Sequence, residues 1–270
     1  MKMVRKLAAA LCVSGVLSAC GGGDAKDLWV QIGGTPGAIS GAGQTTVPPV
    51  TTPTVPAPVV EPGFIVTEAQ FNQIFPNRAS FYTYAGLVDA VKAFPEFAGS
   101  GDRPVRLREA AAFLAQVMHE SGGLRYVTEL NQANWPLYCL ASVQYPCAPG
   151  KQYYGRGPLQ ISWNYNYATA GAAFGVDLLN NPDLVETDAA TAWKTALWFW
   201  MTSVGAGTMT GHAAMVNNAG FGETTRSING ALECGKAAGS DGYLKMQMRV
   251  TYYLDIARLL GVDAGGNLTC

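Results

Sequence analysis

A glutamate at the end of a predicted helix is the residue of this sequence best placed for acid–base chemistry. Glu120 continues an apolar helical pattern through Phe113 and Val117, and Gly122-Gly123 then supply the left-handed residue that ends a helix. Burial and the negative end of the helix dipole both disfavour the charged form of such a carboxyl group. A carboxyl group that keeps its proton near neutral pH suits general-acid catalysis. The alternative is a solvated glutamate at a helix end.

The stretch that follows has the composition of a carbohydrate-binding cleft. Residues 126–167 hold seven of the twelve tyrosines, with Trp135 and Trp163, interleaved with the amides Asn131, Asn134, Gln144, Gln152, Gln160, Asn164 and Asn166. Aromatic faces pack on sugar rings and amides bind hydroxyl groups, although the same aromatic side chains also suit a protein core. The glycines of Tyr153-Tyr-Gly-Arg-Gly-Pro158 predict a turn that brings Gln160 and Ser162 to one side.

The elements that position these residues are mainly helices. Residues 63–270 form one predicted domain, large enough for its own core, and alternating strand patterns are scarce. We therefore expect a mainly α fold with short β-hairpins. The helical patterns cover Thr67–Phe75, Tyr84–Phe94, Arg106–His119, Asp188–Met201, Met209–Ala219 and Tyr243–Leu260.

The first 62 residues indicate export. Positive charges at Lys2, Arg5 and Lys6 precede an apolar stretch, residues 7–19, that is too short to span a membrane. The segment Leu17-Ser-Ala-Cys20 resembles the bacterial lipobox, which implies a signal peptide over residues 1–19 and a lipid on Cys20. The glycines after Cys20 favour the outer membrane or cell surface; plain secretion is the alternative. Residues 20–62 are rich in Pro, Thr and Gly and predict a linker.

Charge and cysteine content exclude several classes of function. A net charge of −1 with 14% charged residues argues against a nucleic-acid partner. No Cys-x-x-Cys or zinc-peptidase spacing occurs, so we expect no metal and no cofactor. Four cysteines remain after export and allow three pairings. If Cys139 and Cys147 close a small loop, Cys234 ties the terminal Cys270 to the domain.

Six separated motifs together resemble the glycoside hydrolase family 19 chitinases, in the compact bacterial branch typified by streptomycete enzymes. The resemblance spans roughly residues 64–270. The motifs are His119-Glu-Ser-Gly-Gly123, Tyr145-Pro-Cys-Ala-Pro-Gly150, Tyr153-Tyr-Gly-Arg-Gly-Pro-Leu-Gln-Ile-Ser-Trp-Asn-Tyr-Asn-Tyr167, Asp177-Leu-Leu-Asn-Asn-Pro-Asp-Leu-Val185, Trp193-Lys-Thr-Ala-Leu-Trp-Phe-Trp200 and Ser227-Ile-Asn-Gly-Ala-Leu-Glu-Cys234.

The resemblance implies a bilobal, lysozyme-like, α-rich fold that hydrolyses β-1,4-linked N-acetylglucosamine polymers internally and with inversion. It implies Glu120 as general acid, Glu129 as general base and Ser162 as a holder of the attacking water. Glu233 and Arg249 would form a charged network behind the pair. The substrate-binding residues it implies are Gln160, Tyr165, Asn166, Lys194, Asn229, Tyr145 and Trp163.

The chemistry of inversion agrees with the spacing of the two glutamates. Inverting enzymes place their carboxyl groups roughly 6.5–9.5 Å apart to admit a water. Because a glycine pair separates them, Glu120 and Glu129 cannot share one helix face, so Glu129 must come from a following loop or strand. Ser121 and Tyr145 replace a Thr and a Trp of the plant pattern but keep a hydroxyl group and an aromatic face.

Two alternatives stay open at the level of the sequence. The same fold occurs in phage-type lysins that cut peptidoglycan, and a lipid-anchored enzyme facing a cell wall suits that substrate. A non-catalytic chitin-binding protein would require the loss of a catalytic carboxylate, and both are present. We expect a monomer that binds chitin or chito-oligosaccharides.

Overall fold

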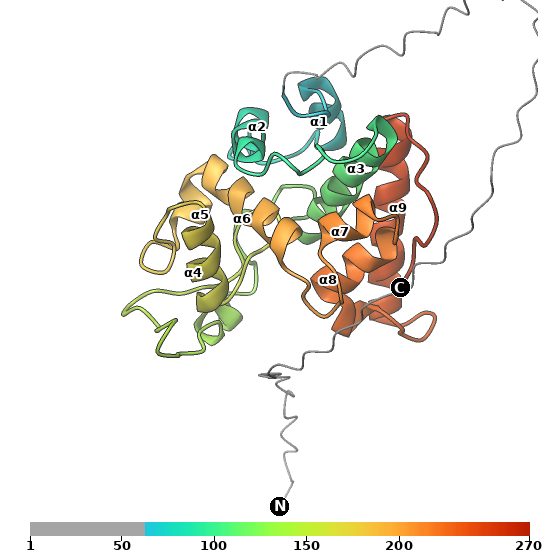
Figure 1. Ribbon diagram of the computed structural model, residues 1–270. Coiled ribbons are helices and arrows are strands. Elements are labelled where there is room, and N and C mark those ends of the chain that lie inside the picture. Colours follow the sequence, from blue (N-terminus) through green and yellow to red (C-terminus); the bar gives the residue numbers. More distant parts are fainter. Residues whose placement is uncertain (1–62) are drawn as a thin grey trace, which may run out of the picture. The chain divides into compact units, whose positions relative to one another are not determined.

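Helices dominate the computed structural model, which describes residues 63–270 (Figure 1). The predicted signal peptide, Cys20 and the linker lie outside the described residues. Within the described part, nine α-helices and one 3-10 helix, η1, follow one another. Their bounds are α1 (Glu68–Ile74), α2 (Tyr84–Lys92), α3 (Arg103–Glu120), η1 (Gln132–Leu137), α4 (Asn164–Ala173), α5 (Leu184–Thr187), α6 (Ala189–Thr202), α7 (Gly211–Val216), α8 (Phe221–Glu233) and α9 (Asp241–Leu259).

All six helices predicted from apolar periodicity are present, with ends that shift by no more than three residues. Side-chain caps account for several of the starts. Thr67 and Gln70 form a capping box at α1, and the carboxylate of Asp102 accepts a hydrogen bond from the Val105 amide at α3. Asp188 accepts from two amides in the first turn of α6. The polar residue before each apolar stripe therefore sets where the helix begins.

The sequence patterns missed α4 and α8, along with the short α5 and η1, and none of these four has a side-chain cap. Helix α4 follows Trp163, whose φ of +76° lies in the left-handed region, and helix α8 follows Gly220. Helix α8 is also broken internally, because Asn229 has a non-helical φ of −144°. Neither helix carries the start signals on which reading a sequence depends.

The β-hairpins that we expected are reduced, in the described residues, to two isolated antiparallel bridges. Arg156 takes part in both, with Thr128 on one side and Ile161 on the other. Gly157 follows at once with a φ of +78°, and a β-carbon there would lie 3.2 Å from Val185. This turn ends the pairing before a ladder can extend.

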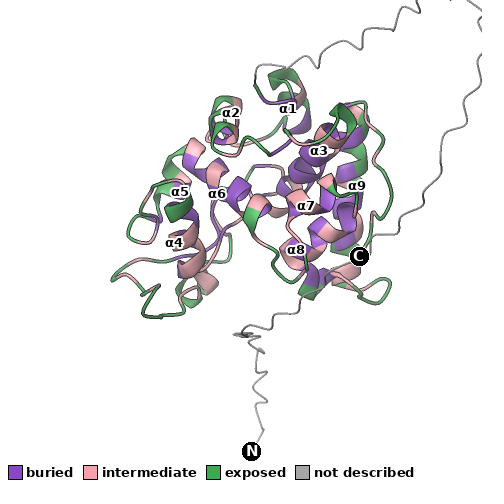
Figure 2. Cartoon of the chain, viewed as in Figure 1, coloured by how far each residue is buried: buried purple, intermediate pink, exposed green. Residues whose placement is uncertain are grey.

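Two hydrophobic clusters divide the described residues into two lobes, as the bilobal expectation requires. The larger cluster joins α1, α2, α3, α6 and α9 around Phe113 and Trp193, and the smaller one packs Tyr153, Tyr167 and Trp198 between α4 and α6. Helix α6 contributes to both clusters. Its buried face runs through the middle of Figure 2, between the exposed surfaces of the two lobes.

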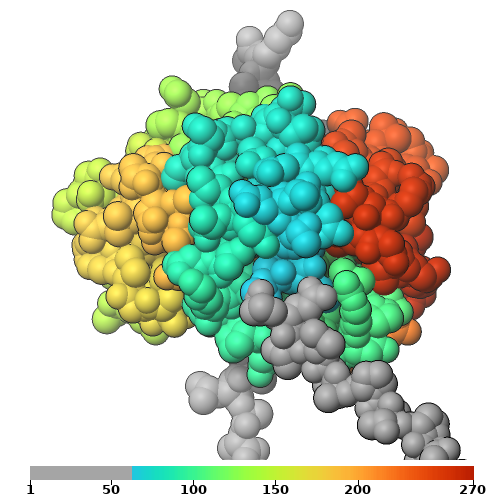
Figure 3. All heavy atoms as spheres, turned by 90° about the horizontal axis from the view of Figure 1, so that it is seen from above, coloured from blue at the N-terminus to red at the C-terminus, as the bar shows by residue number. Residues whose placement is uncertain are grey.

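The first described segment lies across the junction of the lobes. Seen from above, α1 and α2 cover the centre, with α9 on one side and α4 to α6 on the other (Figure 3). Helix α2 packs against α6, and α3 packs mainly against α9. The long helix α3 is therefore held from several sides, and its C-terminal end carries Glu120.

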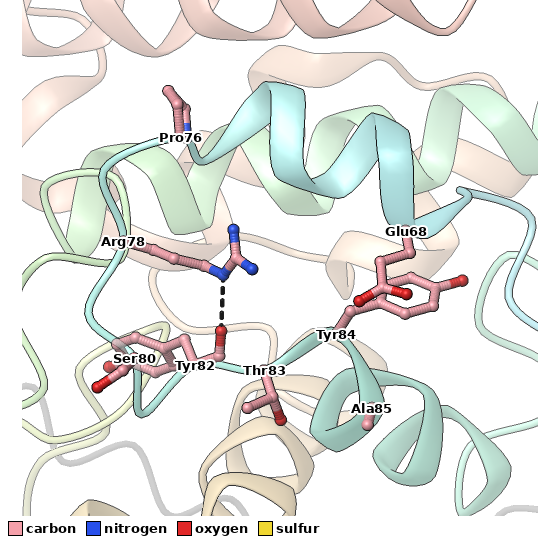
Figure 4. Close-up of a pocket in the computed structure, with 8 residues that line it drawn as sticks. All are labelled: Glu68, Pro76, Arg78, Ser80, Tyr82, Thr83, Tyr84 and Ala85. Atoms are coloured by element: carbon pink, nitrogen blue, oxygen red, sulfur yellow. Dashed lines mark hydrogen bonds between the residues drawn. The ribbon is translucent and has the colours of Figure 1, made fainter.

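The connection between α1 and α2 is fixed by one arginine (Figure 4). Arg78 donates hydrogen bonds to the carbonyls of Tyr82 at 2.9 Å and Phe75 at 3.1 Å, and its guanidinium lies 4.9 Å from the centre of the Phe71 ring. A polar hollow of about 380 Å³ opens beside it, with Glu68 and Tyr84 on the far wall. None of the site residues predicted from the sequence lines this hollow.

Across residues 63–270, no helix combines the length and the apolar character needed to cross a membrane.

Candidate active site

The end of α3 is built to stop immediately after Glu120. The Ser121 hydroxyl donates to the Val117 carbonyl at 2.7 Å and accepts from the Leu124 amide at 2.9 Å. Gly122 and Gly123 have φ values of +59° and +73°, as the helix stop predicted. A β-carbon at Gly122 would lie 2.6 Å from the Tyr126 ring. The backbone turns sharply here and leaves Glu120 on the wall of a pocket.

That pocket, of about 220 Å³, collects six of the twelve residues assigned by resemblance, and Glu129 is not among its lining residues. It lies between the end of α3, the turn before α4, and α8. Its polar and aromatic lining is suited to a sugar, because amides, a hydroxyl group and an indole face one space. The predicted site residues among its lining are Glu120, Gln160, Ser162, Trp163, Asn166 and Asn229.

An arginine pairs with Glu120 and changes the environment expected for it. Nη2 of Arg249 lies 2.5 Å from Oε1 of Glu120, whose side chain is 21% exposed. From the sequence, the expected surroundings of Glu120 were an apolar stripe and the negative end of the helix dipole. The guanidinium of Arg249 adds a positive charge beside the carboxyl group that neither of those two features includes. Glu120 is therefore an ion-paired residue at the pocket wall and not one in a purely apolar site.

Glu233 shares the same guanidinium and is buried with it. Its two oxygens accept from Nε and Nη2 of Arg249 at 2.7 and 2.8 Å, and each residue is 1% exposed. Burial opposes ionisation of Glu233, yet the hydrogen bonds and charge of Arg249 hold its pKa below the usual range. Burial alone would lower the pKa of Arg249, but Glu120 and Glu233 hold it above its ordinary value. Arg249 thus remains a cation between two carboxyl groups.

Gln116 completes this network, and the sequence analysis did not assign it. Its Oε1 accepts from Nη1 of Arg249 at 2.6 Å, and its Nε2 donates to the hydroxyl groups of Thr224 and Thr225. All of these contacts are buried. The signal was present, since Gln116 precedes Glu120 by four residues on the same helix face.

His119 is the other neighbour that sequence reasoning left without a role. Burial, and then the charge of Arg249, lower the pKa of His119 to about 4. The imidazole is therefore neutral near neutral pH and adds no second cation beside Glu120. Its ring centre lies 6.3 Å from that of Tyr252 on α9.

Glu129 comes from an extended segment, as its separation from Glu120 required. Its amide donates to the Gly155 carbonyl at 2.8 Å, and the Gly157 amide donates to the Val127 carbonyl at 2.8 Å. These bonds flank the bridge between Thr128 and Arg156. The residue is therefore anchored on the turn that also carries Gln160 and Ser162.

The carboxylate of Glu129 accepts hydrogen bonds from three donors. Asn134 Nδ2 and the Tyr138 hydroxyl reach Oε1 at 3.0 and 2.9 Å, and the Gly155 amide lies 3.5 Å from Oε2. Burial, together with the bond to Glu129, raises the pKa of Tyr138 to about 12. The phenol therefore keeps its proton and donates it in the hydrogen bond to Glu129.

Hydrogen bonds fix the polar residues of the pocket. Gln160 adopts a φ of +50°, and its Nε2 donates to the Gly157 carbonyl at 3.0 Å. The Ser162 hydroxyl donates to the Gln160 carbonyl at 3.1 Å, and Asn166 Nδ2 donates to the Ser162 carbonyl at 2.9 Å. Asn229 Nδ2 donates to Oε1 of Glu233 at 2.7 Å, which links the pocket to the buried network.

Three predicted substrate-binding residues lie outside the pocket lining. The Tyr165 ring stacks on Trp163 with centres 6.0 Å apart, so it adjoins the pocket. Tyr145 lies on the loop closed by Cys139 and Cys147. Lys194 lies on α6, near the helix start at Asp188. Burial opposes ionisation of Asp188, but hydrogen bonds from Thr191 and Ala190 and the charge of Lys194 hold its pKa below the usual range. The structure does not bring Tyr145 and Lys194 to the Glu120 pocket.

Both disulfides considered from the sequence are present. Cys139 pairs with Cys147, and Cys234 pairs with the terminal Cys270. The second bond ties the end of the chain to the end of α8. Among residues 63–270, no group of three or more His, Cys, Asp or Glu side chains is arranged to hold a metal ion.

The mainly helical fold and its polar pocket suit a carbohydrate-active enzyme, and comparison with known proteins shows the family. The family model described as "Chitinase class I" (Glyco_hydro_19) matches residues 65–270. The chain therefore belongs to glycoside hydrolase family 19 and is a glycoside hydrolase of the chitinase type.

The relatives include bacterial and plant proteins. Chitinase C from Streptomyces griseus HUT6037 shares 56% identity with a TM-score of 0.73, over 77% of this chain and 81% of its own. "Endochitinase B" of Zea mays is 48% identical over 213 residues, which is 76% of this chain and 70% of that protein. "Inactive chitinase-like protein 1" of Hevea brasiliensis is 41% identical over 243 residues, covering 78% and 76%.

Proposed function

We propose that this protein is an endo-acting chitinase of the compact bacterial branch that hydrolyses β-1,4 N-acetylglucosamine linkages with inversion. Glu120 is the general acid and Glu129 the general base. The observation that carries the proposal is the contrast between them: Glu120 shares one guanidinium with another carboxylate, whereas Glu129 accepts from three neutral donors. Two carboxyl groups in unlike environments are the condition for an acid and a base in one site.

The charge balance at Glu120 suits an acid. Arg249 supplies one positive charge to two carboxyl groups, and Glu233 binds it through both oxygens. If Glu120 is also ionised, the cluster carries a net negative charge, which a proton on Glu120 removes. Because Arg249 engages Oε1, we assign the proton to Oε2 of Glu120, from which it passes to the glycosidic oxygen as the bond breaks.

The donors around Glu129 suit a base. A carboxylate oriented by hydrogen bonds from Tyr138, Asn134 and the Gly155 amide can take a proton from a water on the opposite face of the sugar. We assign the second contact of that water to the Ser162 hydroxyl, which lies on the turn paired with the Glu129 segment. The water then attacks the anomeric carbon from the side away from Glu120, which inverts its configuration.

The sugar chain is assigned to the amides and rings around the pocket. Gln160, Asn166 and Asn229 bind hydroxyl and acetamido groups, while Trp163 and Tyr165 pack on sugar faces. We assign Lys194 and Tyr145 to sugar-binding subsites that lie outside this pocket, farther along the bound polysaccharide.

Replacing Glu120 by Gln tests the catalytic assignment. We expect Glu120→Gln to abolish hydrolysis of chitohexaose while the variant still binds the oligosaccharide, since the amide keeps the shape of the side chain and cannot donate a proton of the right acidity. Release of reducing ends and calorimetric titration measure the two properties. Normal turnover by the variant would overturn the assignment. If the parent protein binds chitohexaose but does not hydrolyse it, the chain would instead resemble "Inactive chitinase-like protein 1" of Hevea brasiliensis in lacking activity.

The substrate is tested by supplying purified colloidal chitin and purified peptidoglycan in parallel. We expect soluble products from chitin. Products from peptidoglycan alone would refute chitin as the substrate and support a cell-wall hydrolase on the same fold.

We also propose that the chain is exported and anchored through a lipid on Cys20, so that residues 63–270 act at a membrane surface. The support is the lipobox-like Leu17-Ser-Ala-Cys20. Metabolic labelling with a fatty acid should mark the parent chain but not Cys20→Ser. Equal labelling of both, or labelling of neither, would contradict the anchor.

A further inference from the structure

An uncharged loop with exposed apolar side chains borders the candidate base. Residues 130–150 contain no Asp, Glu, Lys, Arg or His. Large apolar side chains nevertheless stand in solvent there: Leu130 is 69% exposed, Leu137 63%, Leu140 51% and Val143 107%. We call these four residues the apolar loop surface. Large exposed apolar side chains that recur within one short segment make that segment a candidate binding surface.

Hydrogen bonds and a disulfide fix the part of this surface that carries Leu140 and Val143. The buried side chain of Asn164 accepts from the Leu140 amide at 3.0 Å and donates to the carbonyls of Leu140 at 3.0 Å and Tyr145 at 2.7 Å. The Ser142 amide donates to the Tyr145 carbonyl, which forms a tight turn with Val143 at its tip. The Cys139–Cys147 disulfide closes the same loop. A surface presented in fixed positions loses little conformational entropy on binding.

The apolar loop surface is also continuous with the site. Leu130 directly follows Glu129, and Leu137 ends η1. Trp135 of η1 donates from its indole to the Glu129 carbonyl at 3.1 Å and stacks on Tyr154 with ring centres 3.9 Å apart. Tyr138 donates to the Glu129 carboxylate at 2.9 Å. A polymer chain near Glu129 therefore passes beside this loop.

The absence of charge on the loop decides between possible occupants. An anionic membrane surface is bound by clusters of Lys and Arg, and the charged peptide stems of peptidoglycan call for charged partners. Residues 130–150 offer neither. Insoluble chitin is an uncharged solid whose sheets expose sugar C–H faces, and these match neutral apolar side chains.

We propose that the apolar loop surface binds the face of insoluble chitin, contacting chains that neighbour the one held at Glu129. This inference rests on the proposed function and adds the physical form of the substrate. The loop supplies adhesion to the solid, whereas the pocket supplies the chemistry on a single chain.

A double variant, Leu137→Ser with Val143→Ser, tests the proposal in the full-length protein. Both side chains are exposed, so we expect folding to be unchanged. The control is Leu254→Ser, a residue 36% exposed on α9, which Figure 1 shows on the opposite side from the loop. Depletion from suspensions of insoluble chitin measures binding, and hydrolysis of soluble chitohexaose measures the chemistry.

We expect the double variant to bind insoluble chitin about tenfold more weakly, because two apolar side chains no longer leave water on contact. Chitohexaose hydrolysis should match the parent, and Leu254→Ser should match the parent in both assays. Unchanged binding by the double variant would overturn the proposal, as would an equal loss of chitohexaose hydrolysis. So would a change from dimer to monomer in gel filtration, because the surface would then join two copies of the chain.

Failure of the proposed function gives a different result. In that case the parent hydrolyses neither insoluble chitin nor chitohexaose, while the binding assay still reports whether the loop contacts the solid. A loss of binding to peptidoglycan but not to chitin would assign the surface to the other polymer and refute this inference.

Discussion

Removing the guanidinium of Arg249 should destabilise the fold more than any surface change. The side chain is 1% exposed and is the shared partner of Glu120, Glu233 and Gln116. Arg249→Leu leaves Glu233, also 1% exposed, as a buried carboxylate whose remaining donor is Asn229. Breaking one side of a buried ion pair costs roughly 3–5 kcal/mol of unfolding free energy. For a domain of this size, that loss lowers Tm by about 6–20 °C.

Urea unfolding at neutral pH, followed by circular dichroism, measures the free energy of unfolding directly. Arg258→Leu is the matched control on the same helix, because Arg258 pairs with Asp255 in an exposed i,i+3 contact with side chains 79% and 60% exposed. Exposed pairs of this kind contribute about 0–1 kcal/mol.

A double-mutant cycle tests the cause of the loss. Adding Glu233→Gln to Arg249→Leu removes the stranded charge, so the double variant should lose less than the sum of the two single variants. If Arg249→Leu costs no more than Arg258→Leu, or if the two buried substitutions are additive, the buried network does not stabilise the fold as argued.

Two further predictions concern contacts away from the pocket. His212 donates to the buried carboxylate of Glu109 at 2.7 Å, and this hydrogen bond raises the pKa of His212 above 6.5. The resulting stability is present below the unfolded pKa and is lost as pH rises through the folded one, so His212→Gln should lower the unfolding free energy more at about pH 5 than at about pH 9. Equal losses at both pH values would contradict this assignment. Asn164→Ala leaves the amide and carbonyl of Leu140 without their partner, while the Tyr145 carbonyl keeps the Ser142 amide, and it should cost roughly 2–4 kcal/mol by urea unfolding. A loss below about 1 kcal/mol would show that the Asn164 hydrogen bonds do not hold the loop.

Helices that begin with a polar cap and carry an apolar stripe could be predicted from the sequence. The stripe through Phe113 and Val117 and the glycine stop after Glu120 gave α3 its end, and the structure places that stop where expected. Helices α4 and α8 lack side-chain caps, and Trp163 takes a positive φ that no local pattern favours. Their starts depend on packing between segments distant in the sequence.

The same limit applies to the candidate site. The position of Glu120 at a helix end suggested an acid from the residues alone. The resemblance to the family assigned Glu129 as the base and Glu233 and Arg249 as a supporting network. Arg249 and Glu120 are 129 positions apart, so no local sequence pattern could predict the contact between them. Gln116 and Tyr138 were not predicted as site residues. Gln116 accepts a hydrogen bond from Arg249 and Tyr138 donates one to Glu129, and these contacts exist only in the folded chain.

The anomeric form of the first product tests the central claim most directly. Proton NMR, recorded during the first minutes of chitohexaose hydrolysis by the parent protein, separates the two anomers of the new reducing end before they interconvert. Acid catalysis by Glu120 with water activated by Glu129 predicts that the α-anomer forms first from the β-linked substrate. Initial release of the β-anomer would mean retention of configuration and would contradict the roles assigned to both residues.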